Sequence, residues 1–72
     1  MTVIAVVKTE LGRIRLVEDE GLFFTTRNFT SALDGKLLVS TIHVSVEKAA
    51  EWYELAEEQG AVLAPFPVAV AS

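Results

Sequence analysis

The chain contains no cysteine. Neither a disulfide framework nor a cysteine-based zinc site can therefore hold the fold together. The hydrophobic core of a 72-residue chain rarely supplies more than roughly 3–5 kcal/mol of stability. The composition compensates for this limit, because 51% of the residues are hydrophobic. We therefore expect a single domain, residues 1–72, that is stabilised by apolar burial, with a partner subunit as a further source of stability.

Residues that support catalysis or cofactor binding are also scarce. His43 is the only histidine, and the nearby Ser40 and Ser45 lie in no nucleophile-elbow motif. The four glycines are isolated, which excludes a glycine-rich phosphate loop. The acidic run 18–20 lacks the twelve-residue pattern of a calcium loop. We predict a protein that is not an enzyme and that binds no cofactor and no metal.

Signals for export or membrane insertion are missing as well. The apolar opening VIAVV has no basic region before it and is too short for a signal peptide. The uncharged tail AVLAPFPVAVAS is far shorter than the roughly 20 residues that span a bilayer. We expect a cytoplasmic protein without a membrane partner, located in the host cytoplasm if a phage encodes it.

The order of turn signals predicts four strands followed by one helix. Turns are expected at TELG, at EDEG and at the dipeptide Asp34-Gly35. Ser45 is a good N-cap and Gly60 suits the C′ position, so the helix is expected over about 46–59. The predicted fold class is α+β, an antiparallel meander of four to five strands with this helix packed on one face. The four expected strands are 2–8, 13–17, 22–27 and 36–44, and the tail is the possible fifth.

The predicted helix has an apolar side and an acidic side. At about 100° per residue, two alanines, Trp52 and Tyr53 share the side that we expect to pack on the sheet. Four glutamates at spacings i, i+4, i+7 and i+11 form a narrow row, roughly 16 Å long, on another side. This row, which we name the acidic stripe, consists of Glu47, Glu51, Glu54 and Glu58, with Glu57 beside it.

The acidic stripe reduces the stability of the helix. Residues 1–44 are electrically neutral, so the net charge of −4 arises entirely from residues 45–72. Each neighbouring like-charge pair costs roughly 0.2–0.5 kcal/mol. Lys48 in the first turn, and Glu57 and Glu58 in the last, also oppose the helix macrodipole. Two interpretations follow: a solvated face that keeps an apolar protein soluble, or a docking surface for a basic partner.

The short, cysteine-free, acidic α+β profile resembles that of small phage-encoded inhibitors of the anti-CRISPR type. The resemblance implies that the acidic stripe occupies the DNA-binding groove of a surveillance complex. The stripe offers about one charge per 5.5 Å, against one per ≈ 1.7 Å in a duplex, so the acidic turn Glu18, Asp19 and Glu20 would have to contribute. The leading prediction is a non-enzymatic, DNA-mimic inhibitor of a basic nucleic-acid-binding complex. The protein itself is expected to be a monomer or weak homodimer, with no direct contact to nucleic acid.

A second hypothesis uses the sheet. If Leu16, Leu22 and Phe24 face the helix together with Ile14, the opposite face contains Arg13, Arg15, Phe23, Thr25 and Arg27. Basic residues that alternate with an aromatic side chain are typical of surfaces that bind single-stranded nucleic acid. The element order is also broadly similar to that of Whirly-type transcription coactivators. The net charge of −4 argues against this hypothesis.

A third hypothesis is a structural or assembly subunit that uses the apolar tail. The tail side chains would then contact a second copy of the chain. The simpler alternative is that they complete the protein's own sheet. The residues concerned are Val62, Leu63, Phe66, Val68 and Val70.

Overall fold

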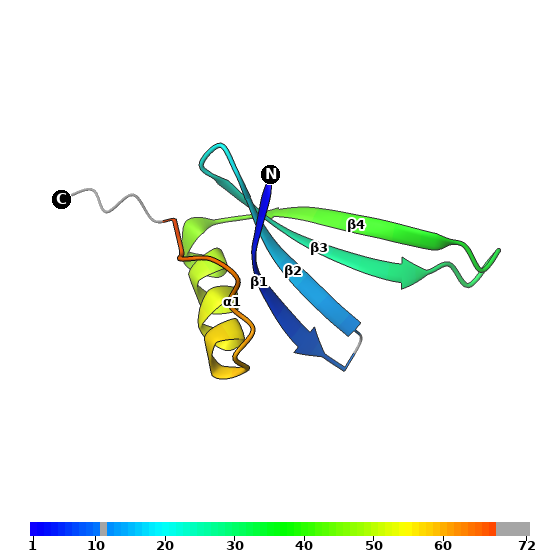
Figure 1. The fold of residues 1–72 in the computed structure, drawn as a ribbon. Coiled ribbons are helices and arrows are strands. Elements are labelled where there is room, and N and C mark those ends of the chain that lie inside the picture. Colours follow the sequence, from blue (N-terminus) through cyan, green and yellow to red (C-terminus); the bar gives the residue numbers. More distant parts are fainter. Residues whose placement is uncertain (11, 68–72) are drawn as a thin grey trace.

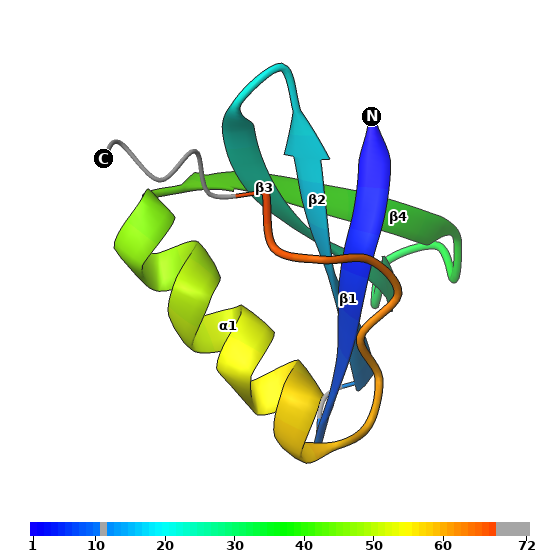
Figure 2. The same cartoon turned by 60° about the vertical axis from the view of Figure 1, so that its left-hand side comes forward.

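The computed structural model describes residues 1–10 and 12–67. Its elements are β1 (Thr2–Thr9), β2 (Gly12–Asp19), β3 (Leu22–Thr30), β4 (Leu37–Val44) and α1 (Val46–Glu58). The strands form one antiparallel sheet in the order β1-β2-β3-β4. Helix α1 lies across one face of this sheet (Figures 1 and 2). The predicted α+β meander with one packed helix is therefore confirmed, with four strands.

The acidic turn between β2 and β3 is a tight hairpin. Glu20 and Gly21 have φ values of 50° and 84°, as a two-residue type I′ turn requires. The Gly21 N–H donates to Glu18 Oε1 at 3.0 Å.

The connection between β3 and β4 is shorter than predicted. Strand β3 continues through residues 28–30 before the turn at Ser31–Lys36.

Both ends of α1 are capped as the sequence predicts. The Ser45 hydroxyl accepts a hydrogen bond from the Lys48 N–H at 3.2 Å. At the other end, the Ala61 N–H donates to the Ala56 carbonyl at 2.9 Å, and the Gly60 N–H donates to the Glu57 carbonyl at 3.1 Å. With Gly60 at φ 69°, these bonds form a Schellman motif. The helix therefore ends within one residue of the predicted limit.

The core lies between α1 and the sheet, mainly over β1. Ala49 and Ala56 are fully buried, and their small side chains let the helix approach the strands closely. Trp52 and Tyr53 are half-buried and pack against this cluster, so the predicted apolar side of the helix is confirmed. The buried sheet side chains beneath them are Ile4, Ala5, Val7, Leu16 and Phe23.

The faces of β3 are the reverse of those predicted. Residues that pair directly across antiparallel strands share a face, and the register pairs Leu16 with Thr25. Phe23 and Thr25 are buried on the helix side, whereas Phe24 pairs with Val17 on the other face. Arg27 pairs with Ile14 and also lies on the helix side. The predicted grouping of Phe23, Thr25 and Arg27 with Arg13 and Arg15 is therefore wrong.

The tail covers the outer edge of β1. The Val6 N–H donates to the Ala61 carbonyl at 3.1 Å, and the Leu63 N–H donates to the Ile4 carbonyl at 2.8 Å. Val62 forms an isolated antiparallel bridge with Ala5 rather than a full fifth strand. Val62 and Phe66 pack against the core, so this part of the tail completes the protein's own fold. Val68 and Val70 lie outside the described residues.

Strands β3 and β4 extend well beyond the rest of the sheet (Figure 1). The last β2–β3 pair joins Ile14 to Arg27, and beyond it residues 28–39 pair only with one another. We name residues 28–39 the β3–β4 arm. The molecule is accordingly elongated, with extents of 50 × 25 × 17 Å.

Candidate partner-binding site

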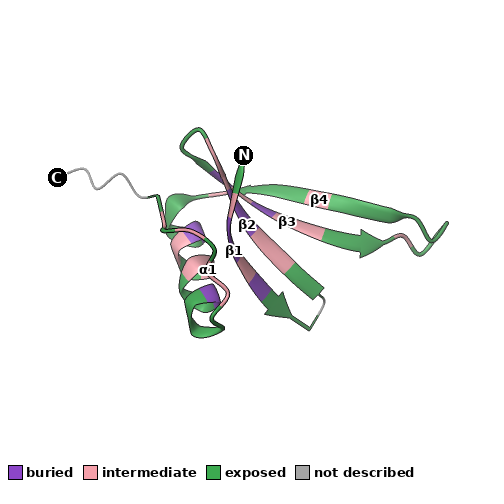
Figure 3. Cartoon of the chain, viewed as in Figure 1, coloured by how far each residue is buried: buried purple, intermediate pink, exposed green. Residues whose placement is uncertain are grey.

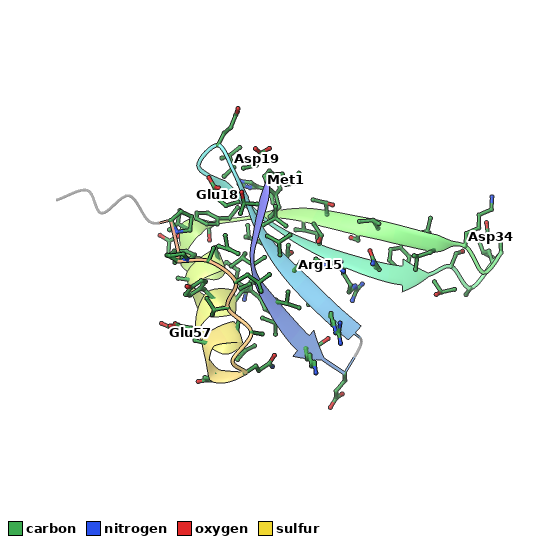
Figure 4. The ribbon with its side chains drawn as sticks, in the orientation of Figure 1. Met1, Arg15, Glu18, Asp19, Asp34 and Glu57 are labelled. Carbon is green, nitrogen blue, oxygen red and sulfur yellow. The ribbon has the colours of Figure 1, made fainter. Side chains whose placement is uncertain are left out.

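The acidic stripe lies on the solvent side of α1. Its four glutamates, Glu47, Glu51, Glu54 and Glu58, are all exposed, and Glu57 beside them is exposed too. Figure 3 shows the outer side of the helix as exposed, and in Figure 4 Glu57 points away from the sheet. The helix orientation that places these carboxylates in solvent follows from the burial of Ala49 and Ala56 on the opposite side. The predicted solvent-facing row is therefore present.

The protein itself neutralises little of the negative charge of the stripe. Within residues 1–10 and 12–67, its one ion pair joins Lys48 Nζ to Glu51 Oε2 at 3.5 Å. Both side chains of this pair are well exposed, and exposed pairs contribute little to stability. No arginine of the described chain pairs with the stripe. Three glutamates of the stripe thus have no basic partner within that part of the molecule.

The acidic turn lies at the end of the sheet where α1 begins. Phe23, just after the turn, pairs with Val44, which immediately precedes the N-cap Ser45. In Figure 4, Glu18 and Asp19 lie at this end, whereas Glu57 lies farther along the helix. The structure therefore places the turn near the start of the stripe and not along its length.

The carboxylates of the acidic turn are partly engaged. Glu18 and Asp19 are half-buried, and Glu20 is exposed. Glu18 accepts the bond from the Gly21 N–H, and Asp19 Oδ1 lies 3.6 Å from the N-terminal ammonium of Met1. Strand alternation puts the Glu18 side chain on the helix side and the Asp19 side chain on the other side. Glu18 is thus better placed than Asp19 to extend the stripe, and Glu20 is exposed at the tip of the turn.

Basic residues gather on the sheet face that α1 leaves open. Lys8 pairs with Arg13, and Arg15 pairs with Val6, which places all three cations on this face. Phe24 and His43 form an edge-to-face ring pair there, with centroids 5.4 Å apart. We name Lys8, Arg13, Arg15, Phe24 and His43 the open sheet face. This face thus has three cations, whereas the helix side has the acidic stripe together with Lys48 and Arg27.

Sequence reasoning missed that Phe24 and His43 belong to this face. The run LFFTT has no apolar–polar alternation, so it does not reveal which phenylalanine is buried. The pairing of Phe24 with His43 across β3 and β4 depends on the register. The tight Glu20-Gly21 turn sets Asp19 opposite Leu22 and therefore Phe24 opposite Val17, which is the signal that could have placed Phe24 on this face. The position of His43 depends on the separate β3–β4 register.

At least two hollows mark the surface of the described residues. An open pocket of about 590 Å³ lies at the edge of β1, lined by Val6, Lys8, Arg13, Gln59 and Ala61. A smaller groove of about 190 Å³ lies between α1 and the outer strands, lined by Ile14, Thr25, Arg27, Ser40, Ile42 and Trp52. Neither hollow brings a nucleophile together with a histidine or carboxylate base. No group of three histidine or acidic side chains in the described residues could hold a metal ion.

Comparisons with protein families, with characterised proteins and with solved structures found no match to this chain. Within the described residues, no helix combines the length and apolar character needed to cross a membrane.

Proposed function

We propose that this protein is a non-enzymatic inhibitor that binds a basic, nucleic-acid-binding partner through the acidic stripe on α1. The observation that supports this proposal most directly is the exposure of all four stripe glutamates without an arginine partner in the described chain. The cations Lys8, Arg13 and Arg15 are on the other side of the sheet. The stripe is therefore available to cations of another molecule.

The like charges of the stripe have a cost that a purely structural helix would avoid. Glu47 and Glu51, Glu51 and Glu54, and Glu54 and Glu58 are neighbours on the helix surface at spacings of three or four. Glutamate–lysine pairs at the same spacings would have stabilised the helix instead. A partner with a row of lysines or arginines would turn this repulsion into attraction, most strongly at low ionic strength.

The geometry fits a groove that otherwise holds a nucleic acid backbone. The stripe is straight and roughly 16 Å long, and the acidic turn adds Glu18 and Glu20 at its starting end. The charge spacing is wider than that of a duplex, so the stripe occupies part of such a groove and does not copy a whole duplex. This mode of action is the one implied by the resemblance to anti-CRISPR inhibitors.

The test begins with a pull-down from a lysate of the native host, followed by mass spectrometry and purification of the captured partner. Binding of the partner is then measured for the wild-type protein and for a variant in which the four stripe glutamates are replaced by glutamine. The proposal predicts that this variant loses at least tenfold in affinity. Unchanged affinity would contradict it and would support the solubility interpretation of the stripe.

A charge-matched control separates the stripe from net charge. Lysines at four exposed positions away from α1 and from the acidic turn leave the stripe intact: Asn28→Lys, Thr30→Lys, Leu33→Lys and Leu63→Lys. This control and the glutamine variant both raise the net charge from −4 to zero. The proposal predicts that the lysine control binds the partner far better than the glutamine variant does.

A second candidate function is binding of single-stranded nucleic acid by the open sheet face. Three cations and two aromatic rings share this face, which is the combination that holds a phosphate backbone while bases stack. The chain's net charge of −4 opposes approach of a polyanion. The acidic helix, however, lies on the other side of the sheet.

A further inference from the structure

The outer edge of β4 is an unusual surface for a charged protein. Residues Leu37–Val44 contain no charged residue and no proline. On its inner side, β4 pairs with β3 through eight consecutive residues without a bulge. Its outer edge has no strand beside it in the described chain. Natural proteins usually protect such an edge with charges, prolines or bulges, and β4 has none of these.

The opposite edge of the sheet is closed by the protein itself. The tail bonds to Ile4 and Val6 of β1. Gln59 extends this cover, because its side-chain amide accepts from the Lys8 N–H at 2.8 Å and donates to the Lys8 carbonyl at 3.1 Å. The described sheet thus has one open edge, which allows a closed pair of molecules and prevents an endless array.

The arm and β4 also expose large apolar side chains. Phe29 and Leu38 pair on the helix-side face, and Ile42 follows on the same face of β4. Leu37 and Val39 are exposed on the other face. The exposed fractions of these five side chains range from 41% to 68%. A two-stranded ribbon with apolar groups on both faces is marginal on its own, and patches of this kind mark interaction sites.

We infer that a second copy of this chain covers this edge. The two β4 strands would pair antiparallel about a two-fold axis at Ser40, forming one continuous eight-stranded sheet. This register places Leu38 opposite the partner's Ile42, so that exposed apolar groups meet each other. Because β4 is uncharged, pairing of the two β4 strands puts no like charges directly opposite each other, although the chain as a whole has a charge of −4. The inference does not rest on the proposed function.

The pairing also covers the smaller groove. Ser40 and Ile42 line that groove together with Trp52 and Arg27, and both strand residues lie at the proposed junction. Tryptophan and arginine are enriched among the residues that dominate binding energy at interfaces. A two-fold axis perpendicular to the sheet does not exchange its faces, so both acidic helices would lie on one side of the joined sheet.

The first test measures the molar mass of the full chain by sedimentation equilibrium from about 1 µM to 1 mM. We expect a monomer–dimer equilibrium in this range, and Val39→Lys should weaken it at least tenfold by placing a charge on the paired edge. Leu63→Lys is the matched control, because Leu63 at the closed edge is 63% exposed and Val39 is 64% exposed. This control should dimerise like the wild type. A monomeric mass throughout the range would overturn the inference.

The second test uses the absence of native cysteines. Residues opposite each other in an antiparallel pair have Cα atoms about 4.5–5.5 Å apart, within the range that a disulfide spans. Ser40→Cys should therefore oxidise rapidly to a disulfide-linked dimer, whereas Glu47→Cys on the exposed stripe should not. If Ser40→Cys crosslinks no faster than Glu47→Cys, the proposed pairing is overturned. This test remains decisive even if the Val39→Lys variant fails to fold.

Discussion

The ring of Phe66 in the tail stacks on the ring of Phe23 in β3, with centroids 5.1 Å apart and planes 12° from parallel. Phe66 also contacts Tyr53 of α1, again with centroids 5.1 Å apart. The Tyr53 hydroxyl in turn donates to the Ala64 carbonyl at 2.9 Å. The tail thus ties the helix to the sheet, and this contact holds Phe23 on the helix side.

Replacement of Phe66 by alanine should destabilise the fold. The side chain is half-buried, so we expect a loss of about 2–3 kcal/mol in the free energy of unfolding, below the 3–5 kcal/mol of a fully buried ring. Urea denaturation followed by tryptophan fluorescence measures this loss. Phe29→Ala is the control, because Phe29 is exposed in the arm. Equal losses for the two variants would contradict the role assigned to the tail.

Gln59 acts as a substitute for a neighbouring strand, since its amide bonds both backbone groups of Lys8. Gln59→Ala removes both hydrogen bonds and should lower the free energy of unfolding by about 1 kcal/mol. This value is at the low end of the range for two hydrogen bonds, because both are accessible to solvent. Gln59→Glu keeps the acceptor but cannot donate to the Lys8 carbonyl, so it should also lower the stability at neutral pH. Chemical denaturation of the three proteins gives the comparison. A Gln59→Glu variant as stable as the wild type would show that the second bond contributes nothing.

The sequence predicted the helix and the strand order well because their signals are local. Ser45 and Gly60 specify the ends of α1 through their own conformations, and the Glu20-Gly21 dipeptide specifies a tight hairpin. The faces of β3 were missed because the register set by that hairpin, with Asp19 opposite Leu22, was not applied to the two adjacent phenylalanines. The contact between Phe23 and Phe66, more than forty positions apart, is a long-range one that no local signal reveals.

The candidate site was predictable only in part. Helical periodicity located the acidic stripe, because burial of Ala49 and Ala56 fixes the opposite side of the helix. The position of the acidic turn relative to α1 required the pairing of Phe23 with Val44, which is a long-range contact. The length of the β3–β4 arm was also missed, since residues 28–30 contain no signal that separates a strand from a loop.

Removal of the stripe charges should stabilise the isolated protein at low ionic strength. Replacing the four stripe glutamates with glutamine relieves three like-charge contacts, together worth about 1 kcal/mol. A gain of this size raises Tm by roughly 4–8 °C in a domain of this length. The gain should disappear in about 1 M salt, where the Debye length is about 3 Å. Circular dichroism during thermal unfolding measures the shift.

Glu10→Gln is the control for this measurement, since Glu10 is exposed in the turn after β1 and lies outside the stripe. Its Tm should change little at either salt concentration. A quadruple glutamine variant that is less stable than the wild type at low salt would contradict the view that the stripe opposes folding.

The open sheet face leads to a separate prediction for nucleic acid binding. If this face binds single strands, a labelled oligonucleotide should bind at low salt, and combining Arg13→Ala with Arg15→Ala should weaken binding about tenfold or more. Arg27→Ala is the control, because Arg27 lies on the helix side of the sheet. Fluorescence anisotropy measures the affinities. Absence of binding at low salt, or equal effects of Arg27→Ala, would exclude this function.

If the acidic stripe excludes nucleic acid from a basic partner, the protein and an oligonucleotide must compete for that partner, and a competition experiment measures this. The purified partner is loaded with a labelled oligonucleotide and titrated with wild-type protein or with the quadruple glutamine variant. Wild-type protein should displace the oligonucleotide, and the variant should require at least tenfold more protein to do so. A stable ternary complex of partner, oligonucleotide and wild-type protein would contradict the proposed exclusion.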